Sequence, residues 1–255
     1  MNQIWVDGVV GAGLPGDDPG LLLGLTVFET IRTYKMHPFR LAAHLDRLES
    51  SAKAMRIPTP SRATIEREIA VAIAEDVRIR YTITAGGHRI VDVAPISQTK
   101  VGGPVSVARM RWRAPDFLPA VVKHGSRAAW IVASQELGVD EVLLIDQNGF
   151  ILEANRSNVF AVIDGVVRTP PIDGRFLVGV TRGALLDAAK LAGVPTDTSP
   201  LAVDSDFDEL YLSSTLKELA PVVQLDGKPG PGGGPFGERL LKAFHQLVED
   251  EASPP

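Results

Sequence analysis

Lys123 lies in the segment AVVKHGSRAAW, where it follows an apolar run and a proline-bearing stretch. A lysine in that position would be partly desolvated, and desolvation lowers the pKa of an amine and makes it an imine-forming nucleophile. The commoner alternative is a solvated lysine at the start of a helix, because most lysines keep their charge in water. Lys123 alone therefore leaves both interpretations open.

Glu153 stands at the end of the apolar strand pattern in GFILEANRSNVF, with Asn155 and Asn158 behind it. A cationic partner, such as a protonated pyridine nitrogen, would explain a carboxylate in that place. An ordinary charge on an edge strand is the alternative. Glu153 is thus a candidate for binding a cationic group, and the residue pattern alone does not decide between the two.

Two clusters of hydroxyl groups could bind an oxyanion such as phosphate. Val180-Thr181 enters an amphipathic helix pattern, and the N–H groups of a helix start together with a threonine hydroxyl suit phosphate. Ser213, Ser214 and Thr215 gather where a strand pattern ends. A plain threonine N-cap and a simple polar turn would explain the same residues, so neither cluster identifies a ligand alone.

Composition excludes several other kinds of site. The 255-residue chain has no cysteine, which removes disulfides, thiolate nucleophiles and cysteine-based zinc sites. Lys and Arg total 26 against 31 Asp and Glu, a net charge of −5 without a long basic run, so no nucleic-acid partner is expected. No apolar run reaches a membrane span and the N-terminus lacks the basic start of a signal peptide, so we expect a cytoplasmic enzyme. No metal site is expected from the scattered histidines His37, His44, His88, His124 and His245.

The N-terminal half has the pattern of a mixed domain of strands and helices. Residues 3–10 predict a hairpin that turns at Asp7-Gly8, and residues 25–34 predict a strand rich in β-branched and aromatic residues. Apolar residues then recur at three- and four-residue steps from Leu41 to Met55, which predicts a helix. Further elements are expected as a helix over 61–75 and strands over 77–87 and 105–113.

The C-terminal half also mixes strands and helices, without a regular βαβ alternation. Asn148-Gly149 and Asp164-Gly165 each stand between two strand patterns and predict two hairpins. The other expected elements are helices over 127–137, 181–192 and 236–248 and a buried strand over 209–215.

A linker is predicted over 114–119, where prolines interrupt the periodicity. We therefore expect a small N-terminal α/β domain over 1–113 and a larger C-terminal domain over 120–255. The mixture of elements in both halves predicts an α+β fold class rather than a Rossmann fold or a barrel.

Four blocks of the sequence resemble the class IV aminotransferases. The first, GLTVFETIRTYKMHPFRLAAHLDRL, is similar to the family's Gly and Phe-Glu strand followed by His-x-x-Arg-Leu. The central block runs from Asp140 to Pro171, and the third and fourth blocks are GVTRGALL and DELYLSSTLKELAPVVQLDG. Together they cover nearly the whole chain in the family's order and spacing. The resemblance implies a fold-type IV enzyme that uses pyridoxal 5′-phosphate (PLP), with its site in the cleft between two domains, and a homodimer.

The resemblance also implies roles for the candidate residues. Lys123 falls at the position of the lysine that holds PLP as a Schiff base and moves a proton between substrate and cofactor. Glu153 matches the acid that keeps the pyridine nitrogen protonated, and Arg47 matches the phosphate-binding arginine. The remaining phosphate contacts implied by the resemblance are Val180, Thr181, Ser214 and Thr215.

Two reactions remain open within this family. A transaminase would move an amino group between an amino acid and a 2-oxo acid, and we favour it as the broader class. The alternative is 4-amino-4-deoxychorismate lyase, which acts on an amino-chorismate substrate and releases pyruvate and 4-aminobenzoate; Lys123-His124 with Arg127 nearby is similar to that enzyme. Branched-chain transaminases usually have a Tyr five residues after the lysine, where this chain has Ala128.

The substrate is not identified by the sequence, because family members act on L-amino acids, D-amino acids or R-amines. Arg32, Arg80 and Arg89 on the N-terminal strands are the candidates for binding the substrate carboxylate, with solvated surface charges as the alternative. A cofactor-free binding protein of the same fold is a third hypothesis. The presence of both Lys123 and Glu153 argues against it.

Overall fold

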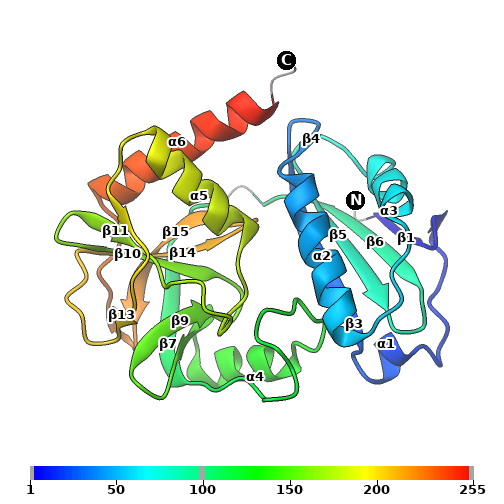
Figure 1. Ribbon diagram of the computed structural model, residues 1–255, viewed down its shortest axis with the longest axis horizontal. Coiled ribbons are helices and arrows are strands. Elements are labelled where there is room, and N and C mark those ends of the chain that lie inside the picture. The colour runs from blue at the N-terminus through cyan, green and yellow to red at the C-terminus, as the bar shows by residue number, and fades with distance from the viewer. Residues whose placement is uncertain (1–2, 98–100, 253–255) are drawn as a thin grey trace. The chain divides into compact units, whose positions relative to one another are not determined.

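The computed structural model describes residues 3–97 and 101–252, and the chain divides into two compact units (Figure 1). Unit 1 contains residues 3–97 and 122–127, and unit 2 contains residues 101–121 and 128–252. Each unit combines a sheet with helices, as the sequence predicts for an α+β chain. No helix among the described residues is long and apolar enough to cross a membrane.

An antiparallel sheet forms the framework of unit 1, with its described strands in the order β2-β1-β6-β5-β3-β4. The predicted hairpin between the first two strands is confirmed, and Asp7 and Gly8 both take the positive φ that such a tight turn requires. The elements of unit 1 are β1 (Gln3–Val6), β2 (Val9–Val10), α1 (Pro19–Leu22), β3 (Thr26–Tyr34), β4 (His37–Pro38), α2 (Leu41–Met55), α3 (Arg62–Ala70), β5 (Val77–Thr84) and β6 (Arg89–Pro95).

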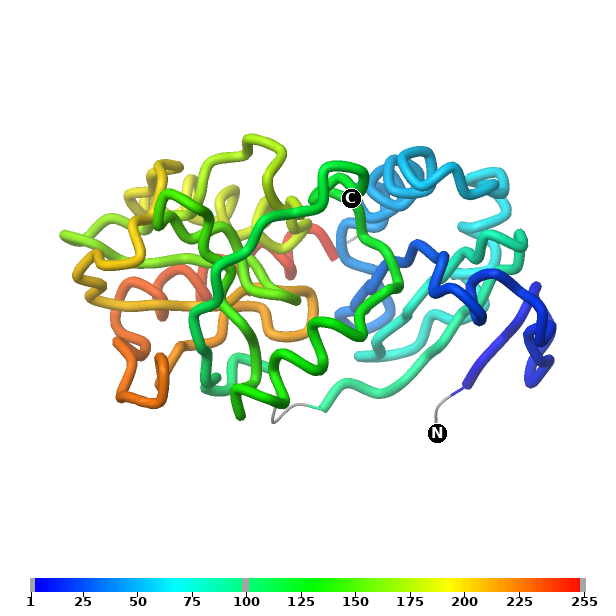
Figure 2. The backbone as a smooth tube through the Cα atoms, turned by 90° about the horizontal axis from the view of Figure 1, so that it is seen from below, coloured from blue at the N-terminus to red at the C-terminus, as the bar shows by residue number. Residues whose placement is uncertain are grey.

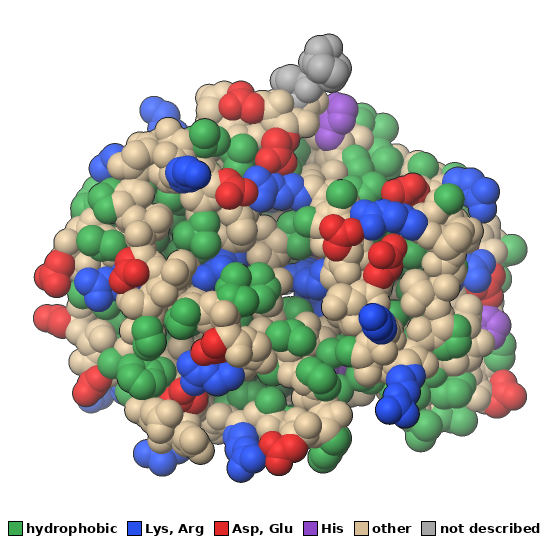
Figure 3. Space-filling model, in the orientation of Figure 1, with side chains coloured by type: hydrophobic (Ala, Val, Ile, Leu, Met, Phe, Trp, Pro, Cys, Tyr) green, Lys and Arg blue, Asp and Glu red, His purple; other side chains and the backbone are tan. Residues whose placement is uncertain are grey.

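The helices α2 and α3 cover one face of this sheet and bury the core of unit 1. Leu45 and Leu48 on α2 pack in one buried cluster with Val27 and Ile31 on β3. Charged side chains are visible on the surface over α2 (Figure 3). Arg62 of α3 and Asp46 of α2 form an ion pair, with Nη1 2.6 Å from Asp46 Oδ1. The apolar stripe therefore fixes which side of α2 faces β3, and this places its polar residues at defined positions along that strand.

Unit 2 has a ten-stranded sheet within its described residues, in the order β12-β11-β10-β14-β15-β7-β8-β9-β13, with β16 paired to β15. The two predicted hairpins are confirmed as β8–β9 and β10–β11, and Asp164 and Gly165 both take positive φ in the second turn. The elements of unit 2 are β7 (Val105–Arg111), α4 (Ala128–Leu137), β8 (Glu141–Ile145), β9 (Phe150–Ala154), β10 (Asn158–Ile163), β11 (Val166–Arg168), α5 (Val180–Leu191), β12 (Thr196–Asp197), β13 (Leu201–Ala202), β14 (Glu209–Ser214), β15 (Glu218–Leu225), β16 (Lys228–Pro229) and α6 (Pro235–Ala252).

The division of the chain differs from the expected domain boundaries at 113 and 120. Strand β7 falls in the range predicted for the N-terminal domain, yet it pairs with β8 and β15 in unit 2. Residues 122–127 fall in the range predicted for the C-terminal domain, yet they cluster with unit 1. Figure 2 traces this path of the chain, in green, through residues 101–127 and into α4. The reason is that alternation predicts a strand but not the sheet that the strand joins.

Candidate active site

Glu29 is a fully buried carboxylate of β3 that holds two side chains of α2 in unit 1. Arg47 donates from Nε to Glu29 Oε1 at 2.7 Å and from Nη2 to Glu29 Oε2 at 2.7 Å. His44 Nδ1 lies 2.8 Å from the same Oε2. A bidentate pair of this kind fixes the plane of the guanidinium, so Glu29 orients the arginine that the sequence predicts for phosphate binding.

The charges in this cluster are set by burial and by the arginine. Burial alone would raise the pKa of Glu29, but the Arg47 cation and the hydrogen bonds from His44 and Arg47 hold that pKa well below its ordinary value. Burial lowers the pKa of His44 in spite of the neighbouring carboxylate. An ionised Glu29 therefore faces a neutral His44, and since a carboxylate only accepts hydrogen bonds, the imidazole proton is on Nδ1.

We expect the free energy of unfolding to fall as the pH drops below 6.5, the ordinary pKa of histidine, because His44 has a lower pKa when folded. The unfolded chain then binds the proton first, so the stabilisation is complete above that pH and is lost at up to about 1.4 kcal/mol per pH unit below it. Glu29, with its depressed pKa, adds its own loss only below its ordinary value of 4.5.

Urea unfolding between pH 4.5 and pH 8, the window above the ordinary pKa of Glu29, measures this slope. His44→Gln is expected to flatten it, whereas the control His37→Gln, at an exposed position, is expected to leave it unchanged. Equal slopes in the wild type and in His44→Gln would contradict the assignment.

Lys123 lies along the edge of β3 and against α2. Its backbone N–H donates to Ser51 Oγ at 3.1 Å, and its carbonyl accepts from the Phe28 N–H at 3.1 Å. The Nζ atom lies 5.1 Å from the centroid of the Phe28 ring, within cation–π range. Ser51 stands one helical turn after Arg47 on α2, and both Arg47 and Lys123 act on the pKa of His44. Unit 1 therefore brings together the two cations that the sequence predicts for the site.

The segment after Lys123 pairs with β3 like a short extra strand. His124 forms an isolated bridge with Val27, and the Gly125 N–H donates to the Thr26 carbonyl at 2.8 Å. A Cβ at Gly125 would lie only 1.9 Å from Thr26 Oγ1. Glycine at this position therefore permits the close approach that fixes Lys123 beside β3.

Asn158 of β10 connects three of the predicted site elements in unit 2. Its Nδ2 donates to the Leu177 carbonyl at 2.9 Å and lies 3.5 Å from Glu153 Oε2. Glu153 Oε1 accepts from the Leu177 N–H at 3.3 Å. Across the sheet, Asn158 is registered with Ser213 of β14. Glu153, the segment leading to α5 and the end of β14 therefore meet at Asn158, a residue that the sequence analysis noted without giving it a role.

The start of α5 has no side-chain cap. Gly179 is the N-cap, and a Cβ there would lie only 2.1 Å from Asn158 Oδ1, so the helix start and the amide are in direct contact. Val180 and Thr181 follow as the first helical residues, with Thr181 buried. N–H groups at such a helix start, together with a threonine hydroxyl, can bind an anion.

The end of β14 supplies the second cluster of hydroxyl groups. Ser213 Oγ is buried and has no hydrogen-bond partner among the described residues. Ser214 Oγ accepts from the Lys217 N–H at 3.3 Å, and Thr215 is half-buried just past the strand. Buried polar groups are nearly always satisfied in proteins, so the Ser213 hydroxyl is a group that a bound ligand could satisfy.

We expect Gly179→Ala to destabilise the cofactor-free protein by about 1–3 kcal/mol, because the new methyl overlaps Asn158 and must push it aside. Gly183→Ala, in the same helix, is the matched control, since nothing lies within 4 Å of its Cβ position. That change is expected to stabilise the protein by up to about 1 kcal/mol. Urea unfolding compares the two, and equal effects would show that Gly179 is not in contact with Asn158.

The three arginines predicted for a substrate carboxylate lie on opposite faces of the unit 1 sheet. Arg89 points to the face covered by α3, where its Nε donates to Glu68 Oε1 at 2.8 Å. Arg32 and Arg80 are on the other face by strand alternation, and the Arg80 guanidinium carbon lies 3.6 Å from the Phe28 ring centroid. Of these three arginines, Arg32 and Arg80 therefore share a face with Phe28, the ring beside Lys123, and Arg89 does not.

Arg78 is a further arginine on this face that the sequence analysis missed. It is registered opposite Arg32 across β3 and β5, and its Nη2 donates to Asp92 Oδ2 at 2.7 Å. Burial lowers the pKa of Arg80, and the nearby Arg78 charge lowers it further. Like charges across a sheet are unfavourable, so this group of arginines suits an anionic ligand.

Comparison with known proteins identifies the family. The sequence model for class IV aminotransferases matches residues 26–225. The chain therefore belongs to the class IV aminotransferase family. The branched-chain-amino-acid aminotransferase of Escherichia coli strain K12 is 30% identical over 268 residues, which cover 89% of this chain and 85% of that protein.

Solved structures agree with this family. A hypothetical aminotransferase from Mycobacterium tuberculosis in a PLP-bound form superimposes with a TM-score of 0.86 and 26% identity, covering 98% of this chain and all of that one. The branched-chain amino acid aminotransferase of Escherichia coli gives a TM-score of 0.85 with 28% identity, over 98% of this chain and 96% of that chain. The fold-type IV architecture is confirmed, and the chain is a PLP-dependent aminotransferase as predicted.

Proposed function

We propose that the protein transfers the amino group of a branched-chain amino acid to a 2-oxo acid, with PLP held as a Schiff base of Lys123. The similarity to the branched-chain enzyme of Escherichia coli over most of both chains supports the amino donor. A related structure from Mycobacterium tuberculosis is described with α-ketoglutarate and the PMP form of the cofactor, which supports a 2-oxo acid as the acceptor. The observation that carries the proposal is the meeting of Glu153, the α5 start and the β14 end at Asn158.

The residues of both units fit PLP by chemical type. Lys123 offers an amine for the aldehyde, and Glu153 offers a carboxylate for the pyridine nitrogen. For the phosphate the chain has an arginine oriented by Glu29, an uncapped helix start at Val180 and Thr181, and hydroxyls at Ser214 and Thr215. The buried Ser213 hydroxyl, without a protein partner among the described residues, is consistent with a ligand in this place.

Bound PLP supplies an electron sink for the charge that develops at the substrate Cα. We propose that the amine of Lys123 would accept the proton from the substrate Cα and deliver it to the cofactor carbon C4′. The negative charge of Glu153 would keep a proton on the pyridine nitrogen, and the hydrogen bonds from Asn158 and Leu177 keep its carboxylate in one orientation. Arg47 in unit 1 and the α5 start in unit 2 each offer donors of the kind that would hold a phosphate group.

Arg32 and Arg80 are the proposed ligands of the substrate carboxylate. Both lie on the sheet face of Phe28, where Arg78 adds positive charge. Arg89 is less suited, because its guanidinium already pairs with Glu68 and lies on the helix-covered face. A guanidinium can bind a carboxylate in a bidentate fashion, which would also orient the Cα proton relative to Lys123.

A pair of assays tests the proposed reaction against the lyase. L-leucine, L-isoleucine and L-valine with 2-oxoglutarate are expected to yield glutamate, whereas D-amino acids and R-amines with the same acceptor are expected to yield much less. Incubation with 4-amino-4-deoxychorismate is expected to release no pyruvate. If pyruvate and 4-aminobenzoate are released without transamination, the proposed reaction is wrong and the protein is the lyase. The Lys123-His124 pair with Arg127 nearby is similar to the pattern of that enzyme.

We also propose a homodimer. Helix α4 has no buried residue in the described chain, and it leaves 57% of Ile131 and 49% of Val132 exposed. Apolar side chains grouped on a surface often mark the contact with a second copy. Sedimentation equilibrium is expected to give twice the mass of the 27.3 kDa chain, and a monomer at assay concentrations would contradict the proposal. The cytoplasmic location stays a prediction from the sequence.

A further inference from the structure

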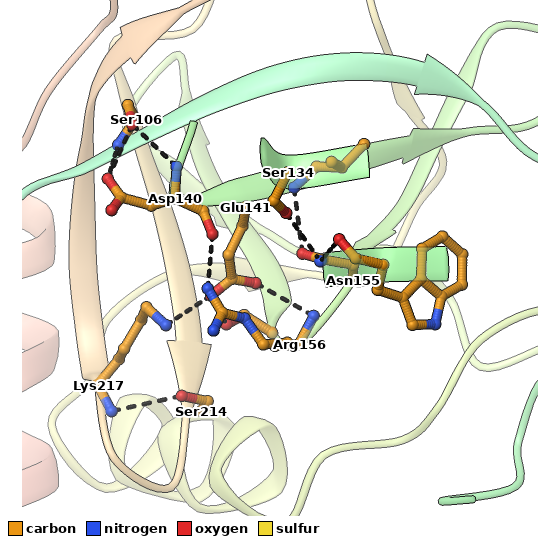
Figure 4. Close-up of polar contacts among 11 residues, drawn as sticks. Ser106, Ser134, Asp140, Glu141, Asn155, Arg156, Ser214 and Lys217 are labelled. Atoms are coloured by element: carbon orange, nitrogen blue, oxygen red, sulfur yellow. Dashed lines mark hydrogen bonds and ion pairs between the residues drawn. The ribbon is translucent and has the colours of Figure 1, made fainter. Parts of the chain in front are cut away.

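Glu141 is a second fully buried carboxylate, and the mechanism proposed above does not use it. It begins β8 in unit 2, and Figure 4 shows it at the centre of a group of polar side chains. Its Oε1 lies 2.5 Å from Lys217 Nζ and accepts from Ser157 Oγ at 2.8 Å. Its Oε2 accepts from the Arg156 N–H at 3.1 Å. The carboxylate is therefore satisfied by one cation, one hydroxyl and one backbone amide.

The partners of Glu141 belong to the two turns that carry the proposed cofactor contacts of unit 2. Arg156 and Ser157 form the turn between β9 and β10, which joins Glu153 to Asn158. Lys217 is in the turn between β14 and β15, two residues after Thr215 and three after Ser214. A single buried carboxylate therefore ties both turns to the first residue of β8.

Lys217 also holds Ser214, which lies three residues before it in the chain. The Lys217 N–H donates to the Ser214 carbonyl at 3.2 Å and to Ser214 Oγ at 3.3 Å (Figure 4). The next residue, Glu218, has a φ of 56°, a conformation that a non-glycine residue adopts only when its surroundings impose it. The contact between the Lys217 ammonium and the Glu141 carboxylate, together with the hydrogen bonds within the turn, therefore keeps Ser214 in one position.

The turn between β9 and β10 is held by contacts of Asn155 and by contacts with Glu141. Asn155 Oδ1 accepts from the Val142 N–H at 3.1 Å, and Asn155 Nδ2 donates to Ser134 Oγ of α4 at 3.2 Å. Glu141 then holds the two residues that follow, Arg156 and Ser157. Asn155, Arg156 and Ser157, which lead from Glu153 to Asn158, are thus each held by polar contacts.

We propose that Glu141 is a positioning residue of the active site, which acts through Lys217 on Ser214 and through Ser157 on the path from Glu153 to Asn158. The proposal rests on the function proposed above, because it assumes that these turns bind the cofactor. A carboxylate can hold both turns at once, since its two oxygens accept from several donors, whereas an amide in its place has one acceptor oxygen and no charge for Lys217.

The test compares Glu141→Gln with Glu209→Gln, a matched variant in the same unit. Glu209 is also buried and also accepts three hydrogen bonds, from Tyr211 Oη within its own strand and from the Phe236 and Gly237 N–H groups at the start of α6. Equilibrium dialysis of the cofactor-free proteins against PLP gives the dissociation constant, and thermal unfolding of the same samples gives the loss of stability.

We expect both variants to lower the melting temperature, and only Glu141→Gln to raise the PLP dissociation constant, by about tenfold or more, the scale on which groups that orient ligands act in metal sites. Glu209→Gln is expected to change it by less than about twofold, as sites without shared partners do. Equal, small changes in the PLP dissociation constant would overturn the proposal and make Glu141 a purely structural residue. Failure of the wild type to bind PLP would instead overturn the proposed function.

Lys217 provides a second route if Glu141→Gln does not fold. Its side chain is 21% exposed, so Lys217→Met is easier to tolerate, and it is expected to weaken PLP binding while Lys217→Arg keeps most of it. In a double variant, Glu141→Gln with Lys217→Met, the two losses are expected not to add, because both remove the same contact. Full additivity would contradict the proposed action through Lys217.

Discussion

The variant Lys123→Ala is expected to lose covalent PLP and to transaminate at least about 10²- to 10⁴-fold more slowly, the range for losing a positioned acid–base group. The fold is expected to persist, because the hydrogen bonds of Lys123 with Ser51 and Phe28 run through its backbone and alanine keeps them. Borohydride reduction followed by mass measurement of the intact chain reports the covalent cofactor, and single-turnover rates report the proton transfer.

Two control variants accompany this experiment, and the first separates the loss of the amine from the loss of its positive charge. Lys123→Arg keeps a cation beside Phe28 but cannot form the covalent bond, so it is expected to fail like Lys123→Ala. Lys53→Ala, at an exposed position of α2, is expected to behave like the wild type. A Lys123→Ala protein that still held PLP covalently would disprove the role assigned to Lys123.

The second large effect is expected for Glu153→Gln. The variant keeps an oxygen to accept from the Leu177 N–H, so PLP is expected to bind, but the charge that holds a proton on the pyridine nitrogen is lost. Transamination is then expected to slow by about 10²- to 10³-fold, as after loss of one electrostatic stabiliser of the transition state. Turnover rates and PLP dissociation constants measured together distinguish a loss of chemistry from a loss of binding.

Glu153→Asp serves as the conservative variant in this experiment. It restores the charge on a shorter side chain and is expected to recover part of the rate without changing the PLP dissociation constant. A Glu153→Gln protein with wild-type turnover would show that the pyridine nitrogen needs no carboxylate partner, and the role of Glu153 would then have to be abandoned.

Local sequence patterns predict those helices and turns of this fold that depend on residues close together in the chain. The apolar stripe from Leu41 to Met55 predicts α2 with its correct bounds, and Asp164-Gly165 predicts the β10–β11 turn. The sequence pattern does not predict strand β15, because a proline such as Pro221 usually interrupts a strand. In the structure, parallel pairing with β7 starts at Val222, just past that proline, so the strand tolerates it.

Other differences between the predicted and the observed elements arise from contacts between residues that are far apart in the sequence. Helix α3 ends at Ala70, although its pattern predicts a helix to residue 75, and strand β6 (Arg89–Pro95) is not predicted at all. The sheet joined by β7 and the return of residues 122–127 to unit 1 are decided by pairing between distant segments. Strand pairing of this kind is non-local, and a single sequence carries little trace of it.

The candidate site shows the same division between local and non-local information. Family resemblance identifies Lys123, Arg47 and Glu153 as site residues, and the structure shows what holds each of them. Ser51 and Phe28 hold Lys123, Glu29 holds Arg47, and Leu177 and Asn158 hold Glu153. The bridging position of Asn158 follows from the register of β10 with β14 and could not be predicted from its sequence neighbours. Alternation along β3 and β6 does separate Arg32 from Arg89, once the covered face of the sheet is known.

The central claim is that Lys123, and no other lysine, carries the cofactor. The most direct test is to reduce the PLP-loaded wild-type protein with borohydride, digest it and locate the modified lysine by mass spectrometry. A single modified peptide that contains Lys123 is the predicted result. Modification at Lys217 or at any other lysine in place of Lys123, or no modification in a protein that transaminates, would contradict it.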